Sequence, residues 1–143
     1  LADAGVYNPA DYAPTDNPEI FDQRVRELAK KIDPSVDPAG NKTPEKTEAT
    51  VTRFVRDPAV KASVLKKAAG ICEGCNLGAP FTTPDGEPFL EVHHLKQLSE
   101  SGPDLVSNAV ALCPNCHRRC HHSSDREVFV ESIYQKVLRL VRV

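Results

Sequence analysis

Four of the five cysteines form two identical pairs, Cys72-x-x-Cys75 and Cys113-x-x-Cys116, separated by 37 residues. Each pair can offer two thiolates to one tetrahedral Zn²⁺ ion, and a Cys₄ set is a common structural zinc site. Disulfides or a redox pair are the alternatives, but no export signal is seen and no βαβ pattern surrounds the pairs. The spacing therefore predicts a structural zinc site, and Cys120 is predicted to be a packed or free thiol.

The five histidines lie in the same stretch as the cysteines, between residues 72 and 122. His93 and His94 are adjacent in a strand-like run, so their side chains point to opposite faces and must do different work. His117 and His121 are four residues apart in a predicted helix and share one side of it. A closed Cys₄ site has no open position for chemistry, so any reaction needs a separate site. One member of the His93–His94 pair can join His117 and His121 as a ligand of a second metal ion at that site. His122 is predicted to be exposed, without an assigned role.

Caps, turn signals and apolar periodicity predict the elements that must position these side chains. The predicted helices cover residues 17–31, 48–56, 57–70, 114–122 and 125–140. A hairpin is predicted over residues 80–95, a polar loop over 96–107 and a short strand over 109–112. Ser124 and Glu127 are expected to form a capping box for the last helix. Lys61, Lys66 and Lys67 are interpreted as solvated surface of the helix 57–70 rather than as phosphate contacts.

The His93–His94 pair, Asn108, and His117 within the run CPNCH resemble the HNH nuclease family, which has the ββα-metal fold. Asn108 follows His94 by 14 residues and precedes His117 by nine, and the two cysteine pairs frame this motif. The runs EVHHL and SGPDLVSNAVALCPNCHRR are similar to the nuclease domain of modification-dependent restriction enzymes of the McrA type. The resemblance covers about residues 57–122. It implies an α+β fold: a small ββα-metal domain with a Cys₄ zinc site, flanked by N- and C-terminal helices.

The resemblance also implies a role for each residue of the motif. His93 occupies a metal-ligand position of the family, and His94 occupies the position of the general base. A neutral imidazole can take a proton from water near neutral pH, provided that its lone pair is not bound to a metal. His117, joined by His121, is expected to complete the divalent metal site. Asn108 is expected to brace the loop that carries the base.

Three flanking residues and the choice of metal complete the predicted site. Arg118 and Arg119 are interpreted either as phosphate contacts or as ordinary exposed helix charge. Glu91 shares a strand face with His93 and is either a hydrogen-bond acceptor for it or a solvated carboxylate. A metal shell of histidines is softer than a carboxylate shell, which favours Mn²⁺, Co²⁺, Ni²⁺ or Zn²⁺ over Mg²⁺.

The predicted function is metal-dependent hydrolysis of DNA phosphodiesters, by the cleavage domain of a restriction enzyme acting on double-stranded, modified DNA. The alternative is a non-catalytic zinc module that binds nucleic acid or protein, which would need the four cysteines but not the histidines. Residues 1–47 are expected to be a linker and helix at the end of a larger protein, and residues 48–143 the nuclease domain. A homodimer is expected for double-strand cleavage, with the apolar stripes at 20–32 and 128–140 as candidate contact faces.

Charge and hydropathy limit the remaining choices. The second part of the chain, residues 51–143, is weakly basic, with 12 Lys/Arg against 10 Asp/Glu, which is compatible with a nucleic-acid partner. No apolar run approaches the ~20 residues of a membrane-spanning helix, and no secretory signal is visible. A cytoplasmic location without a membrane partner is therefore predicted.

Overall fold

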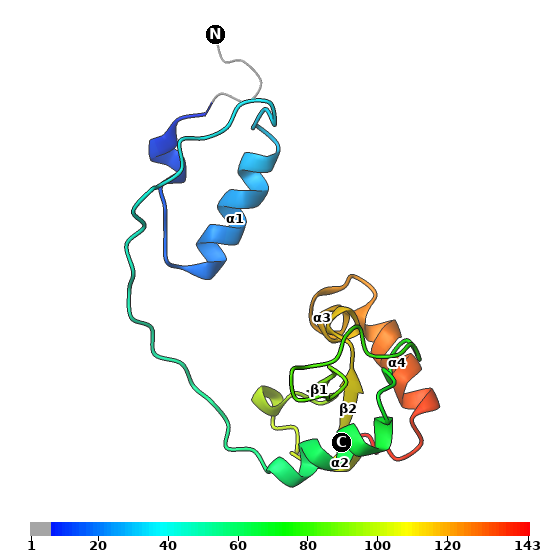
Figure 1. Cartoon of the computed structure of the whole chain (residues 1–143). Coiled ribbons are helices and arrows are strands. Elements are labelled where there is room, and N and C mark those ends of the chain that lie inside the picture. Colours follow the sequence, from blue (N-terminus) through cyan, green and yellow to red (C-terminus); the bar gives the residue numbers. More distant parts are fainter. Residues whose placement is uncertain (1–6) are drawn as a thin grey trace. The chain divides into compact units, whose positions relative to one another are not determined.

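The computed structural model describes residues 7–143, and the chain divides into two compact units, 1–51 and 52–143 (Figure 1). The first unit contains the 3₁₀ helix η1 (Pro9–Tyr12) and the helix α1 (Pro18–Ala29). Helix α1 begins where the sequence predicts, because the Asn17 side chain accepts hydrogen bonds from the backbone of Glu19 and Ile20. The proposed division between residues 47 and 48 stays a prediction. Across residues 7–143, every helix is too short or too polar to cross a lipid bilayer.

The second unit is built around a two-stranded antiparallel sheet (Figure 1). Its elements are α2 (Pro58–Ala68), β1 (Glu91–His94), η2 (Leu98–Glu100), η3 (Val106–Asn108), β2 (Ala109–Leu112), α3 (Pro114–His122) and α4 (Arg126–Lys136). His93 pairs with Val110 and His94 with Ala109. Helix α3 packs against both strands, α4 against α3, and α2 against β2. The small α+β fold with two strands followed by a helix is therefore confirmed.

The core of this unit is small and lies around β2, whose four residues are all buried. Val64 of α2 belongs to the same core cluster as the β2 residues, and so do Phe129 and Ile133 of α4. Cys120 is also a member, which confirms that it is a packed thiol. Val128, which the apolar stripe of the last helix includes, is 74% exposed instead. With so little apolar surface to bury, the unit is one that a structural metal would stabilise.

The prediction of a helix over residues 48–56 is wrong, because this stretch is non-helical and exposed in the structure. Four of its nine residues are β-branched, and such side chains lose rotamer freedom in a helix. A helix of this length is also too short to be stable in water without a packed face. The sequence predicts α2 correctly, with Asp57 as its N-cap and the chain reversing through left-handed backbone at Ala69 and Gly70.

Two other expectations need correction. The hairpin predicted over residues 80–95 is reduced to a single bridge between Thr82 and Pro88, with the turn at Gly86, because proline cannot donate to a strand ladder. The last helix ends at Lys136 rather than near residue 140. Its N-cap is Asp125, which makes no side-chain capping hydrogen bond, so the capping box expected from Ser124 is absent at this helix start.

Candidate metal centres and active site

The four cysteines of the two pairs form one cluster, in which the sulfur atoms all lie within 4.8 Å of one another. All five cysteines of the chain are free thiols, so the disulfide alternative is not realised. Tetrahedral zinc with Zn–S bonds of about 2.3 Å places its sulfur ligands about 3.8 Å apart, which this cluster can meet with small adjustments. The donor set and its spacing therefore fit the predicted structural zinc ion.

Backbone geometry prepares the cluster for a cation. The Cys72 sulfur accepts hydrogen bonds from the backbone N–H groups of Gly74 (3.3 Å) and Cys113 (3.2 Å). Burial alone would raise the pKa of Cys72, but these backbone donors lower it to about 7. Burial raises the pKa of Cys116, and it raises that of Cys120 to about 11. The Cys120 thiol therefore stays protonated, and it is not a member of the four-sulfur cluster.

A second cluster consists of His93, His117 and His121, each of which offers a ring nitrogen within 4.8 Å of the others. The Nε2 atoms of His117 and His121 face each other at 3.3 Å. A metal ion bound to both at about 2.1 Å would set nearly this separation in tetrahedral geometry. Strand β1 contributes one imidazole and one face of α3 contributes two, as the spacing predicts. The donor set and spacing thus fit a divalent transition-metal ion.

The protonation states of the cluster also suit metal binding. Burial, together with the neighbouring His121 and His117, lowers the pKa of His93 to about 3, so this ring is neutral at neutral pH. The Glu91 carboxylate lies 3.3 Å from Nδ1 of His117 and accepts a hydrogen bond from its N–H, which leaves Nε2 of His117 free to bind a metal. Glu91 therefore contacts His117, rather than His93 as strand alternation suggests.

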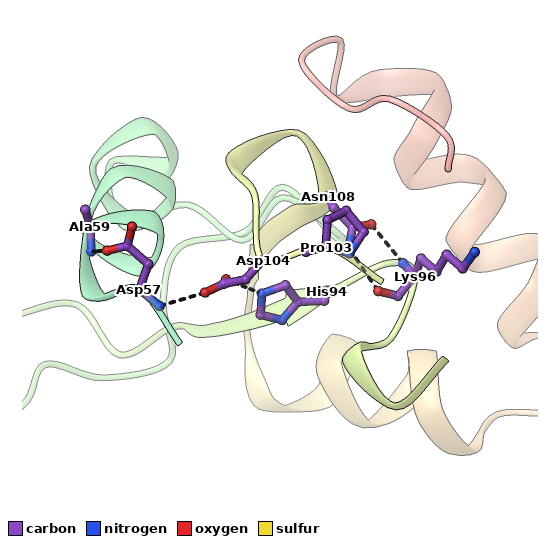
Figure 2. Close-up of polar contacts among 7 residues, drawn as sticks. All are labelled: Asp57, Ala59, His94, Lys96, Pro103, Asp104 and Asn108. Carbon is purple, nitrogen blue, oxygen red and sulfur yellow. Dashed lines mark hydrogen bonds and ion pairs between the residues drawn. The ribbon is translucent and has the colours of Figure 1, made fainter. Parts of the chain in front are cut away.

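His94 lies outside the histidine cluster, as strand alternation predicts, and pairs with Asp104 instead (Figure 2). Its Nε2 lies 2.8 Å from Oδ1 of Asp104, and the other carboxylate oxygen accepts the backbone N–H of Asp57 at 2.7 Å. Because a carboxylate can only accept, Nε2 must carry the proton, and Nδ1 of a neutral His94 then holds a free lone pair. This is the protonation state that a general base requires.

Asn108 is 1% exposed and holds together the loop that follows β1 (Figure 2). Its side chain accepts from the backbone N–H of Lys96 and donates to the carbonyl oxygens of Lys96 and Pro103, each at 2.9 Å. Gly102 lies inside the same loop, where an added Cβ would come within 1.8 Å of the Lys96 oxygen. These contacts fix Pro103 and hence the adjacent Asp104, which is the geometry expected of a bracing residue.

The two arginines of α3 differ in their surroundings. Arg119 forms an ion pair with Asp125 at 2.5 Å, and its guanidinium lies 4.0 Å from the centre of the Phe129 ring. The pKa of Asp125 falls to about 2 because Arg119 and Ser123 donate to its carboxylate. These contacts give Arg119 a structural role in the packing of α3 on α4. Arg118 is exposed, and a phosphate contact stays a prediction for both residues.

The four histidines of the motif border one cavity of about 290 Å³. His94 therefore opens onto the same space as the three-histidine cluster, and a substrate phosphate could reach both. His122 is exposed, as predicted, and does not line this cavity. Asp104 is the residue of the site that the sequence does not reveal, because it lies in an irregular loop and matches no metal or catalytic spacing.

An HNH endonuclease family model matches residues 72–123, which contain both cysteine pairs and all four histidines of the cavity. The resemblance of this stretch to the HNH endonuclease family is therefore confirmed. The chain is 44% identical over 127 residues to the type IV methyl-directed restriction enzyme EcoKMcrA of Escherichia coli (strain K12), a match that covers 89% of this chain. It spans 45% of that relative's length.

A solved structure shares the fold of the domain. The type IV phosphorothioation-dependent restriction endonuclease ScoMcrA matches with a TM-score of 0.52 and 34% sequence identity. The match covers 57% of this chain and 16% of that protein. Both relatives are thus McrA-type restriction enzymes that are much longer than this chain.

Proposed function

We propose that this chain hydrolyses DNA phosphodiesters in a metal-dependent reaction, as the cleavage domain of a restriction enzyme that acts on modified double-stranded DNA. One observation carries the proposal: the imidazole of His94, held by Asp104, borders the same cavity as the three-histidine cluster. The names of the two relatives, methyl-directed and phosphorothioation-dependent, support a modified duplex as the substrate.

The residues of the cavity divide the chemistry among them. A divalent ion held by His93, His117 and His121 would bind the scissile phosphate and offset the charge that develops on it. His94 accepts a proton at Nδ1 from the attacking water, which adds in line with the leaving 3′ oxygen. Asp104 keeps the proton of Nε2 in place and stabilises the imidazolium that forms, as a carboxylate does behind a catalytic histidine.

The two metal sites have separate duties in this proposal. Cys72, Cys75, Cys113 and Cys116 would hold a zinc ion that links the turn after α2 to the start of α3, a structural role that needs no open coordination position. The histidine site is expected to support cleavage better with Mn²⁺, Co²⁺ or Ni²⁺ than with Mg²⁺, because imidazole ligands suit these softer ions. Equal or faster cleavage with Mg²⁺ alone would contradict this choice of ligands.

The substitution His94→Ala tests the catalytic proposal. Loss of a general base should slow cleavage about 10²- to 10⁴-fold while DNA binding is retained. The matched control is His122→Ala, which removes an exposed imidazole that does not line the cavity. The assay follows cleavage of methylated and unmodified duplexes with each divalent ion. A wild-type chain that binds DNA but cleaves neither duplex with any ion would support the non-catalytic zinc module instead.

Assembly and location belong to the same proposal. A domain with one cleavage site acts on one strand at a time, so double-strand cleavage requires two copies or two events, and we expect a homodimer. Light scattering at micromolar concentration, with and without DNA, would measure it, and a strictly monomeric species in both conditions would count against a dimer. A restriction enzyme meets its DNA in the cytoplasm, where we expect the protein to act.

A further inference from the structure

The cavity of the histidines has a neighbour with which it shares a wall. The neighbouring cavity, of about 330 Å³, is also bordered by His94, and its other lining residues include Asp104, Lys61 and Val92. Four residues line both cavities: Phe54, Arg56, Val92 and His94. The imidazole proposed as the general base therefore stands at the junction of two adjoining spaces, and only the first contains the metal-binding histidines.

Two cationic side chains, Arg56 and Lys61, border the second cavity together with two carboxylates. Arg56 lies in the exposed stretch before α2, and Lys61 lies on the first turns of α2. Within residues 52–143, neither side chain forms an ion pair with a carboxylate. Asp57 and Asp104 also line this cavity. The Asp57 carboxylate accepts the backbone N–H of Ala59 at the start of α2, and both oxygens of Asp104 accept hydrogen bonds, from His94 and from the backbone of Asp57. The two cations are therefore available to an anionic ligand.

We propose that Arg56 and Lys61 form a subsite for the DNA phosphate next to the scissile one; this inference rests on the proposed nuclease function. When the histidine cluster takes the scissile phosphate, the strand continues past His94 into the second cavity. Arg56 then stands between the two phosphates, where its planar guanidinium can contact the second one through two N–H groups. Phe54, 53% exposed, adds an aromatic wall against which a sugar or base can pack.

Lys61 therefore differs from the other lysines of α2. The sequence groups it with Lys66 and Lys67 as solvated surface, but it alone of the three lines the cavity next to His94. Lys67 borders a different cavity, between α2 and the chain after α4. The chain thus supplies matched controls: Lys66 for Lys61, and Arg53 for Arg56, since neither control residue lines the two cavities.

The salt dependence of DNA binding tests the subsite directly. Affinity of the full chain for a duplex is measured between about 50 and 200 mM salt. No divalent ion is added beyond the structural zinc, so that the DNA stays intact and His94 keeps its contact with Asp104. Each phosphate contact contributes about 0.9 to the slope of log affinity against log salt. Arg56→Gln and Lys61→Gln should each lower the magnitude of the slope by about this amount, and Arg53→Gln and Lys66→Gln should not. Equal slopes for Arg56→Gln and Arg53→Gln would overturn the inference.

A second measurement locates the contacted phosphate. A single neutral methylphosphonate beside the mapped cleavage site should weaken binding by the chain that carries Arg56 and have little further effect on Arg56→Gln. Equal weakening of both would place Arg56 elsewhere and overturn the subsite. Arg56→Lys keeps the charge and should retain the slope, which separates loss of a contact from misfolding.

The outcomes for the subsite and for the nuclease are distinguishable. Cleavage by the wild type with Mn²⁺, combined with an unchanged slope for Arg56→Gln, would remove the subsite and leave the nuclease standing. Absence of wild-type cleavage with every divalent ion would remove the proposed function and the subsite with it. Cleavage together with the paired slope change supports both.

Discussion

Replacing Asp104 with Asn would test whether this residue controls the protonation of His94. In the wild type, one carboxylate oxygen accepts from the Asp57 backbone at 2.7 Å and the other from His94 at 2.8 Å. An amide has only one oxygen. If that oxygen stays with the Asp57 N–H, the amide NH₂ faces Nε2 of His94 and donates to it. The proton of the neutral imidazole then moves to Nδ1, which can no longer accept one from water.

The size of the effect follows from the contact that is lost. A hydrogen bond to a charged group is worth about 1.5–3 kcal/mol. Since about 1.4 kcal/mol changes a rate tenfold, Asp104→Asn should slow cleavage about 10- to 100-fold. The loss should not exceed that of His94→Ala, which removes the base itself and is expected to cost about 10²- to 10⁴-fold.

Single-turnover cleavage of a labelled duplex, with enzyme in excess, measures this step apart from DNA binding and product release. Asp85→Asn is the matched control, because it makes the same exchange in an exposed turn. Unfolding curves of both variants check that Asp104→Asn still folds. A rate within twofold of the wild type for Asp104→Asn would refute the reasoning, since His94 would then need no carboxylate to hold its proton.

Metal removal and pH supply the remaining predictions. A chelator that strips zinc should unfold the unit 52–143, seen as a loss of helical circular dichroism, and Cys113→Ser should have the same effect while Cys120→Ser keeps its zinc. Zinc-loaded protein without the second metal should lose about 1 kcal/mol of unfolding free energy between pH 7 and 5.5. The pKa of His93 is lowered from 6.5 to about 3 in the folded chain, so only the unfolded chain gains this proton as the pH falls. Urea unfolding of His93→Gln should show a flatter dependence, and an unchanged one would contradict the assignment.

The parts of the site that obey short-range rules are predictable from sequence. Cys113-Pro114 marks the start of α3, and the four-residue spacing of His117 and His121 places both on one side of it. Alternation along β1 sends His93 into the metal cluster and His94 away from it. Each of these inferences needs only the geometry of one helix or one strand.

The parts that sequence did not predict depend on contacts between distant segments. Asp104 is set by the backbone of Asp57, 47 residues earlier, and no periodicity links the two. Arg56 lies in a stretch for which the sequence predicts a helix, and in a helix its side chain would have a different direction. Glu91 reaches across to α3, a contact that depends on how the helix packs on β1. Tertiary packing decides all three.

The donor that steadies Asp104 is a main-chain group, which affects how this domain can be excised and joined to other proteins. Alanine scanning at position 57 would leave the contact in place, whereas a fragment shortened to Pro58 would lose it while keeping all the metal ligands. Such a fragment should bind its metal ions normally and yet cleave DNA slowly. A chimaera that joins this domain to a foreign recognition module should therefore place the junction before Thr52.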